Sequence, residues 1–290
     1  MAKLSVVINT FNEAEILPRA INSVKDIAYE LVVCDMQSLD KTAQIARKLG
    51  AKVYSHKKEK YVELVRNLMT TKASGDWVLI LDPDEEVSSS LAKKIKEILN
   101  KPLADYYRLP RKNIIFGKWL THTNWWPDYQ IRLFRKGFVS WQDEIHSFPI
   151  TKGKGADIEL KEALAIVHHN YENLAQYMQK MLRYTSVQSE ELLKSGYVFR
   201  WQDLVNKPIN EFLGRFFEGE GFKDGVHGLA LSLLQSFSEL VVYLNVWEKQ
   251  GNKTEKISKK DLKKELLTSV KAFKWWIGKK LSWLSYLKFR

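Results

Sequence analysis

Apolar and polar residues alternate in blocks along the first hundred positions of the chain. Continuous apolar runs, which are typical of strands buried on both faces, occupy residues 4–8, 30–35, 51–55 and 76–82. Stretches with helical spacing of apolar residues follow them, at residues 14–25, 38–50, 61–72 and 88–100. This alternation predicts an α/β fold in which a parallel sheet is covered by helices on both faces.

The pattern changes after residue 104. Three strand-like segments separated by turns follow, at residues 104–117, 129–137 and 138–142. We expect them to extend the sheet in mixed fashion, and from about residue 172 the spacing becomes helical. The polar stretch 249–261 is a candidate hinge. The predicted organisation is a mostly parallel mixed sheet flanked by helices, a C-terminal helical extension and a basic tail, at residues 1–175, 176–252 and 253–290.

Acidic residues crowd the loop that follows the fourth predicted strand. In VLILDPDEEVS, Asp82, Asp84, Glu85 and Glu86 lie so close that their repulsion requires a nearby positive charge. An Asp-x-Asp pair at the carboxyl end of a parallel strand suits Mg²⁺ or Mn²⁺, which also binds substrate phosphates. The alternative is that these acids only cap the next helix, a role that fits Glu85 and Glu86.

Two further loops are expected to lie beside the acidic one. The carboxyl ends of parallel strands meet at one edge of a sheet, which is where α/β proteins bind their ligands. Residues 10–13 and 35–40 follow the first two predicted strands, so they should converge with residues 82–86.

Composition and charge narrow the possible functions. The single cysteine, Cys34, excludes an internal disulfide and a cysteine-rich zinc site. The N-terminal apolar run is short and lacks a small-residue cleavage site, so we expect a cytoplasmic protein. Residues 253–290 hold twelve Lys or Arg and three Asp or Glu, which places +9 of the total charge of +12 in the tail. A basic tail favours an anionic surface as partner, and we expect no nucleic-acid partner.

Four motifs, in order and at compatible spacing, resemble the family 2 glycosyltransferases. They are LSVVINTFNEAEILPRAINSV, LVVCDMQSLDKTAQIARKLGAKVY, RNLMTTKASGDWVLILDPDEEVS and WWPDYQIRLFRKG. The resemblance is strong over residues 3–175, continues more weakly through GFKDGVHGLALSLLQSF, and is nearest to the bacterial subgroup that adds sugars to the lipopolysaccharide core, the glucosyltransferase type. It implies a GT-A fold, a nucleotide diphosphate sugar as donor, and transfer with inversion.

The resemblance assigns roles to residues within these motifs. The positions expected to contact the nucleotide and its diphosphate are Thr10, Asn12, Glu13, Asp35, Arg66 and Asp82. Asp82 and Asp84 match the Asp-x-Asp that holds Mg²⁺ or Mn²⁺, and His168 could complete the metal site or be a structural histidine. Ordinary roles compete with these, because Asn12 could cap a helix and Arg66 could be a surface residue.

An inverting transfer needs an acid that accepts the proton of the acceptor hydroxyl. The candidates in WQDEIHSF are Glu144 and Asp143, which rank almost equally. In the nearest subgroup the acid tends to follow a histidine, whereas Ser147 follows His146 here. Asp128, in WWPDYQ, is the third candidate and could instead position the acceptor or a backbone turn.

Aromatic and basic side chains surround these candidates. Four tryptophans favour a partly exposed wall for an acceptor sugar over ordinary core, at Trp119, Trp125, Trp126 and Trp141. Arg132 and Arg135 alternate with Leu133 on a predicted strand, so we expect them to share one face. There they could hold acceptor phosphates or only solvate that face.

Two C-terminal segments bear on membrane contact. Residues 227–247 are long enough to cross a membrane, but Gln235, Glu239 and Asn245 favour a buried or interface-resting helix. In the tail, apolar residues recur at spacings of three and four, which predicts a basic amphipathic helix suited to an anionic membrane. The stripe consists of Leu262, Leu266, Val270, Phe273, Ile277, Leu281 and Leu284, flanked by Trp276 and Trp283. The alternative is a helix docked on its own protein.

Together these features predict a cytoplasmic, peripheral-membrane glycosyltransferase. It would move a hexose from a nucleotide diphosphate sugar, with a UDP-sugar favoured, to a lipid-linked or glycolipid acceptor. The rival enzyme is a polyprenyl-phosphate sugar transferase, because a phosphate nucleophile needs no strong base. The rival from another class is a non-catalytic membrane or nucleic-acid binder, which leaves the acids at the strand ends unexplained.

Overall fold

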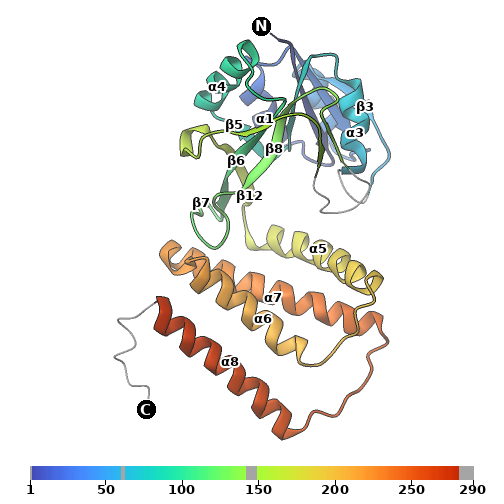
Figure 1. The fold of residues 1–290 in the computed structure, drawn as a ribbon. Coiled ribbons are helices and arrows are strands. Elements are labelled where there is room, and N and C mark those ends of the chain that lie inside the picture. The colour runs from blue at the N-terminus through green and yellow to red at the C-terminus, as the bar shows by residue number, and fades with distance from the viewer. Residues whose placement is uncertain (1, 60–62, 142–148, 281–290) are drawn as a thin grey trace. The chain divides into compact units, whose positions relative to one another are not determined.

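The computed structural model describes residues 2–59, 63–141 and 149–280 (Figure 1). The chain divides into two compact units. The first consists of residues up to 113 together with 127–170, and the second consists of residues 114–126 together with the chain from 171 onward.

A mixed β-sheet forms the centre of the first unit. Its parallel part runs in the spatial order β3 (Lys52–Ser55), β2 (Glu30–Asp35), β1 (Leu4–Thr10) and β4 (Trp77–Leu81). The sheet continues with β8 (Tyr129–Arg135), β6 (Tyr106–Ile115), β12 (Ile166–Tyr171) and β5 (Glu85–Val87). Because β8 is antiparallel to both β4 and β6, the predicted mixed sheet is confirmed.

Short strands and single helical turns occur in both units. The remaining strands are β7 (Lys118–Trp119), β9 (Val139–Ser140), β10 (Ile150–Thr151) and β11 (Gly155–Asp157). Single helical turns lie at Glu162–Leu164, Gly214–Glu218 and Gly221–Asp224.

Helices cover both faces of the parallel strands, as predicted. The helices of the first unit are α1 (Leu17–Val24), α2 (Thr42–Lys48), α3 (Glu63–Lys72) and α4 (Ser89–Asn100). Side chains of β1 alternate between two cores, so that Ile8 packs with α1, α2 and α4 while Val7 packs with α3. Ser88 begins α4, because its Oγ accepts the Leu91 N–H over 3.1 Å. This arrangement leaves the carboxyl ends of β1, β2 and β4 at one edge of the sheet.

The second unit is helical, which agrees with the spacing seen from residue 172. Its helices are α5 (Leu174–Lys194), α6 (Asp203–Leu213), α7 (Val226–Lys249) and α8 (Lys259–Lys280). α7 packs against α5 and α6, and α8 packs against α6. Within the described residues, α7 is the one helix whose length and composition would allow a membrane span, and 28% of its most apolar window is buried.

One face of α8 is docked on its own unit while another stays exposed. Phe273 contacts the rings of Phe212 and Phe217, and Asn206 donates to Glu265 over 2.9 Å. Phe273 therefore belongs to the docked face rather than to a free stripe. Three other members of the predicted stripe are 39–48% exposed, namely Leu262, Leu266 and Val270. The positions Leu281, Trp283 and Leu284 lie outside the described residues.

Candidate active site

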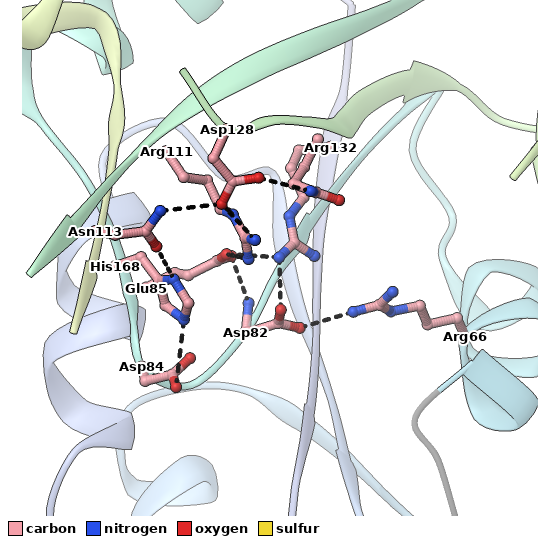
Figure 2. A network of polar contacts seen from close by, with 10 residues as sticks. Arg66, Asp82, Asp84, Glu85, Arg111, Asn113, Asp128, Arg132 and His168 are labelled. Atoms are coloured by element: carbon pink, nitrogen blue, oxygen red, sulfur yellow. Dashed lines mark hydrogen bonds and ion pairs between the residues drawn. The ribbon is translucent and has the colours of Figure 1, made fainter. Parts of the chain in front are cut away.

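Asp82 follows β4 and lies between two arginines from other elements (Figure 2). Nη2 of Arg66, on α3, donates to Oδ1 over 3.0 Å, and Nη2 of Arg132, on β8, donates to Oδ2 over 2.5 Å. Burial alone would raise the pKa of the Asp82 carboxyl, but the charges of Arg132 and Arg66 outweigh burial and hold this pKa well below its usual range. The positive charge beside the first acid of the loop is therefore supplied by arginine.

Glu85 is the most deeply buried acid of the loop, with no exposed surface. Its Oε1 accepts from Arg132 over 2.5 Å and from Arg111 over 3.3 Å, and its Oε2 accepts the backbone N–H of Asp82 over 3.0 Å. The expectation that Glu85 caps the next helix is wrong, because Ser88 takes that role and the Glu85 side chain turns inward. Arg132 thus ties the end of β4 to the start of β5.

The two arginines of β8 do not share a face. Arg132 is 4% exposed and contacts the acids of the loop, whereas Arg135 pairs with Asp105 over 3.1 Å and lies over the Trp77 ring. Side chains alternate with a period of two along a strand, so residues three apart point to opposite faces. The expected common face, and a shared role toward acceptor phosphates, is therefore excluded by the structure.

Asp128 is held by several donors at once. Arg111 approaches its Oδ2 to 2.6 Å, Asn113 donates to the same oxygen over 3.1 Å, and Gln130 donates to Oδ1 over 2.9 Å. Burial raises the pKa of the Asp128 carboxyl, but the charge of Arg111 and the amide donors lower it by more, so the net shift is downward. A carboxylate stabilised in this way is a weak base.

Asp84 faces His168 across the end of the acidic loop, with 3.6 Å between Oδ2 and Nε2. Asn113 fixes the imidazole, because its amide nitrogen donates to Asp128 and its oxygen must then accept from Nδ1 of His168, 2.6 Å away. A neutral imidazole consequently points the lone pair of Nε2 toward a carboxylate oxygen. A divalent cation, or a proton, stabilises two such acceptors.

The residues present fit a cation that takes part of its shell from a substrate. Within the described ranges, no group of three or more His, Cys, Asp or Glu side chains is arranged to hold a metal ion. Asp84 and His168 would supply one oxygen and one nitrogen ligand to such a cation, whereas Asp82 is already bound by arginines. Mg²⁺ and Mn²⁺ bound through few protein ligands complete their shells with phosphate oxygens and water.

Buried polar atoms lacking a protein partner lie at the ends of β1 and β2. Asn9, Thr10 and Asp35 are 4%, 1% and 6% exposed. In the part of the chain that the structure describes, both amide atoms of Asn9, Oγ1 of Thr10 and Oδ1 of Asp35 have no hydrogen-bond partner. Thr10 is in register with Asp35, so these two side chains are neighbours, while the Asn9 side chain points to the other face of the sheet. Because buried polar atoms are nearly always paired, this edge is suited to a polar ligand.

Sequence reasoning singled out Thr10 and Asp35 but did not consider Asn9. The signal was present, because Asn9 interrupts the apolar run of β1 one residue before the loop. Its lateral neighbour in the parallel register is Cys34 on β2.

The loops after β1 and β2 are tied directly to each other, as their strand ends predicted. The Asn12 N–H donates to Ser38 Oγ over 2.9 Å, and Asn12 Oδ1 accepts the Leu39 N–H over 2.7 Å. The Glu13 N–H donates to Thr42 Oγ1 over 2.8 Å. The Asn12 side chain therefore joins two loops and caps no helix, while its backbone adopts a left-handed conformation with φ of 56°.

The candidate bases Asp143 and Glu144, and His146 beside them, lie outside the described residues. The chain that leads to them is fixed beside Arg66. The side chain of Asn67, the next residue on α3, accepts the Trp141 N–H over 2.8 Å and donates to the Trp141 carbonyl over 2.6 Å.

The four tryptophans do not form one wall. Trp141 is 6% exposed and packs against Phe134 in the core of the first unit. Trp125 is half-buried against Tyr171, whereas Trp119 and Trp126 form an edge-to-face pair with centroids 5.3 Å apart. All three half-exposed tryptophans belong to the second unit.

Comparisons with known proteins bear on this site. The family model described as "Glycosyl transferase family 2" matches residues 5–154. An uncharacterized glycosyltransferase of Rickettsia typhi is 32% identical over 251 residues, which cover 83% of this chain and 85% of the relative. An uncharacterized glycosyltransferase of Mycoplasma pneumoniae is 30% identical over 141 residues, which cover 43% of this chain and 46% of the relative.

Two solved structures are also similar to this chain. S. aureus TarS 1–349 in complex with UDP-GlcNAc has a TM-score of 0.47 at 15% identity, covering 88% of this chain and 94% of that one. The mannosyltransferase PcManGT from Pyrobaculum calidifontis, in complex with GDP-Man and Mn²⁺, has a TM-score of 0.45 at 14% identity, covering 94% of this chain and 83% of that one.

Proposed function

This chain belongs to glycosyl transferase family 2 and is a glycosyltransferase, and we propose that it is a metal-dependent, inverting hexosyltransferase. In this proposal the donor is a nucleotide diphosphate sugar, with a UDP-sugar favoured. The acceptor is a lipid-linked or glycolipid glycan such as a lipopolysaccharide core. The mixed sheet with helices on both faces is the GT-A architecture that the motifs implied.

The observation that carries the proposal is the set of buried, unpartnered polar atoms on Asn9, Thr10 and Asp35 beside the arginine-bound Asp82. A carboxylate oxygen can accept an N–H of a base or a hydroxyl of ribose, and an amide can donate and accept at once. Arg66 offers a fork of donors at the same edge of the sheet, which suits a diphosphate.

Asp84 and His168 are the side chains that would hold Mg²⁺ or Mn²⁺. When bound, such a cation supplies Lewis-acid stabilisation of the negative charge on the departing diphosphate. Arg66 and Arg132 fix Asp82, and Arg132 also binds Glu85, so that both acids flanking Asp84 are held in place. The protein thereby orients its metal-binding carboxylate before any ligand arrives.

The acid that accepts the proton from the acceptor is Glu144 or Asp143 in this proposal. Asp128 is disfavoured as that base, because Arg111 and two amides hold its pKa below the usual range. Substitution of each candidate tests the assignment, as Glu144→Gln, Asp143→Asn and Asp128→Asn, with transfer and donor binding measured in parallel. Loss of transfer with donor binding kept, in one of the first two variants, identifies the base. Transfer kept in all three variants would favour a phosphate nucleophile, as in a polyprenyl-phosphate sugar transferase.

We propose that the enzyme works at the cytoplasmic face of a cell membrane. The exposed face of α8 carries Leu262, Leu266 and Val270 beside lysines, and residues 253–290 hold a net charge of +9. Apolar side chains with neighbouring lysines suit an anionic headgroup layer.

The experiment that tests the function is a transfer assay with a panel of nucleotide diphosphate sugars and detergent-solubilised glycolipid acceptors, on the full chain and on the chain without residues 253–290. The proposal expects the shortened chain to keep donor hydrolysis and nucleotide binding while losing membrane association. A non-catalytic binder would lose every activity with the tail, and the full chain would then turn over no donor. NMR of the product reports whether the anomeric configuration is inverted.

A further inference from the structure

The loop at residues 120–126, in the second unit, is held in place by one buried acid. Asp224 has 4% of its side chain exposed, and it accepts from the N–H of His122 over 2.9 Å and from Thr121 Oγ1 over 3.0 Å. Nδ1 of His122 lies 3.2 Å from the same carboxylate. A hundred residues of sequence separate the two segments, so this contact is a feature of the fold and not of a local turn.

The loop is also held in a strained backbone conformation. Thr123 and Asn124 have φ of 56° and 62°, a left-handed pair that non-glycine residues rarely adopt. Arg215 donates to the Thr123 carbonyl over 3.0 Å, and the Thr123 N–H donates to Gly219 over 2.7 Å. A Cβ at Gly221 would lie 2.4 Å from the Thr123 side chain, so the supporting segment must be glycine there. Strain maintained by this many contacts is typical of loops that present side chains for binding.

The loop carries two partly exposed side chains, one aromatic and one polar. Trp126 is half-exposed, and its ring stands at 90° to that of Trp119 with centroids 5.3 Å apart. His122 is 29% exposed, and in the part of the chain described here its Nε2 has no protein partner. Trp125, by contrast, anchors the loop, because its ring packs against Tyr171.

These features suit a pyranose ring. The C–H bonds on one face of a pyranose carry slight positive charge, and the face of an indole ring carries negative charge. Donation from Nδ1 of His122 to Asp224 leaves Nε2 as an acceptor for a sugar hydroxyl. The segment 119–126 therefore brings together a histidine oriented by a buried carboxylate and two partly exposed indoles, which offer directional hydrogen bonding and stacking.

We propose that Trp126, Trp119 and His122 form a saccharide-binding platform on the second unit, which takes a pyranose of the acceptor glycan. The assignment rests on the proposed function for the identity of the glycan as acceptor. Binding of a sugar to the platform does not depend on the nucleotide edge of the first unit, so the two can fail separately.

The test is saturation-transfer NMR on the full chain with a panel of methyl hexopyranosides and one methyl heptopyranoside, and with sorbitol as a control that has hydroxyls but no ring face. We expect transfer to the ring C–H protons of at least one glycoside and none to sorbitol. Trp126→Ala should weaken the binding of that glycoside about tenfold, which is the size expected for the loss of one aromatic stacking contact. His122→Ala should weaken it severalfold, whereas Trp126→Phe should keep most of the signal.

Trp275→Ala serves as the matched control, because Trp275 is a 55% exposed tryptophan elsewhere in the same unit. It should leave the glycoside signal unchanged, and UDP titrations should be the same in all variants. Absence of transfer from every glycoside with the wild-type protein would overturn the proposal, and so would an unchanged signal in Trp126→Ala. If the glycosides bind but no nucleotide does, the platform stands and the proposed donor chemistry fails.

Discussion

Replacing Arg132 with methionine removes one cation from two buried acids. The Arg132 side chain is 5% exposed and its Nη2 lies 2.5 Å from both Asp82 and Glu85. Methionine fills much of the same volume without the charge, so the effect of Arg132→Met reports on electrostatics more than on packing.

The expected loss in the free energy of unfolding depends on which arginine partners Asp82 and Glu85 retain. Removal of one partner from a buried ion pair costs about 3–5 kcal/mol, because the other charge stays buried. Asp82 keeps Arg66 at 3.0 Å, and Glu85 keeps Arg111 at 3.3 Å. We therefore expect the lower end of that range, about 3 kcal/mol off the free energy of unfolding.

Equilibrium unfolding in urea, followed by the fluorescence of tryptophans such as the buried Trp77, measures this loss. Arg135→Met is the matched control, because Arg135 lies on the same strand and pairs with Asp105 with 41% of its side chain exposed. A pair that exposed contributes less than about 1 kcal/mol. Equal losses in the two variants would refute the account of a buried network.

The pH dependence of the loss has a definite sign. In the wild type the pKa of Asp82 is lowered, so its stabilisation is complete above its unfolded pKa of about 4 and is lost as the pH falls further. In Arg132→Met this pKa rises, because the Asp82 carboxylate has lost one cation. The loss in the free energy of unfolding is therefore largest at neutral pH, where Asp82 is charged, and becomes smaller as the carboxyl takes a proton. The gap between variant and wild type should therefore narrow below about pH 4. A gap that widens there would contradict the assigned cause.

Three further predictions follow from particular residues. Asn9→Val should keep or raise the urea midpoint of unfolding, because the substitution removes two buried polar atoms that have no partner. Calorimetry should show weaker UDP binding to this variant, and unchanged UDP binding would count against a role for Asn9 in ligand binding. Burial alone would raise the pKa of Glu30, but hydrogen bonds from partners that include Lys52 outweigh it and lower this pKa to about 2. The contribution of Glu30 to the free energy of unfolding should therefore be lost as the pH falls from 4.5 toward 2. Between pH 4.5 and pH 2 the urea midpoint of Glu30→Gln should fall less than that of the wild type. Parallel curves of midpoint against pH for the two proteins would contradict this prediction. Leu266→Ser combined with Val270→Ser should leave the urea midpoint unchanged, since both side chains are about half exposed, but should reduce sedimentation with phosphatidylglycerol vesicles about tenfold.

The sheet and the convergence of its loops could be predicted because their signals are local. Buried strands such as β1 are continuous apolar runs, and parallel strands bring their following loops to one edge whatever the side chains are. The link between Asn12 and Ser38 realises that expectation.

The charge network could not be predicted, because its partners are far apart in sequence. Arg132 lies 50 residues from Asp82, and no periodicity records that pairing. Glu85 was misassigned for a related reason, since an acid just before a helix resembles a cap until the short strand β5 turns it inward. The α8 stripe was divided by tertiary packing, because Phe273 met aromatic rings on other helices of its unit.

The central claim is that Asp84 and His168 hold a divalent cation that a nucleoside diphosphate completes. Calorimetric titration of a nucleoside-diphosphate panel, with and without Mn²⁺, tests it on the wild type, Asp84→Asn and His168→Ala. Asp157→Asn is the control, because this exposed acid of the same unit pairs with Arg108 over 2.6 Å, away from the acidic loop. We predict binding of one diphosphate that requires Mn²⁺, disappears in Asp84→Asn, weakens in His168→Ala and persists in Asp157→Asn. Diphosphate binding that does not depend on Mn²⁺, or that is unchanged in Asp84→Asn, would contradict the claim.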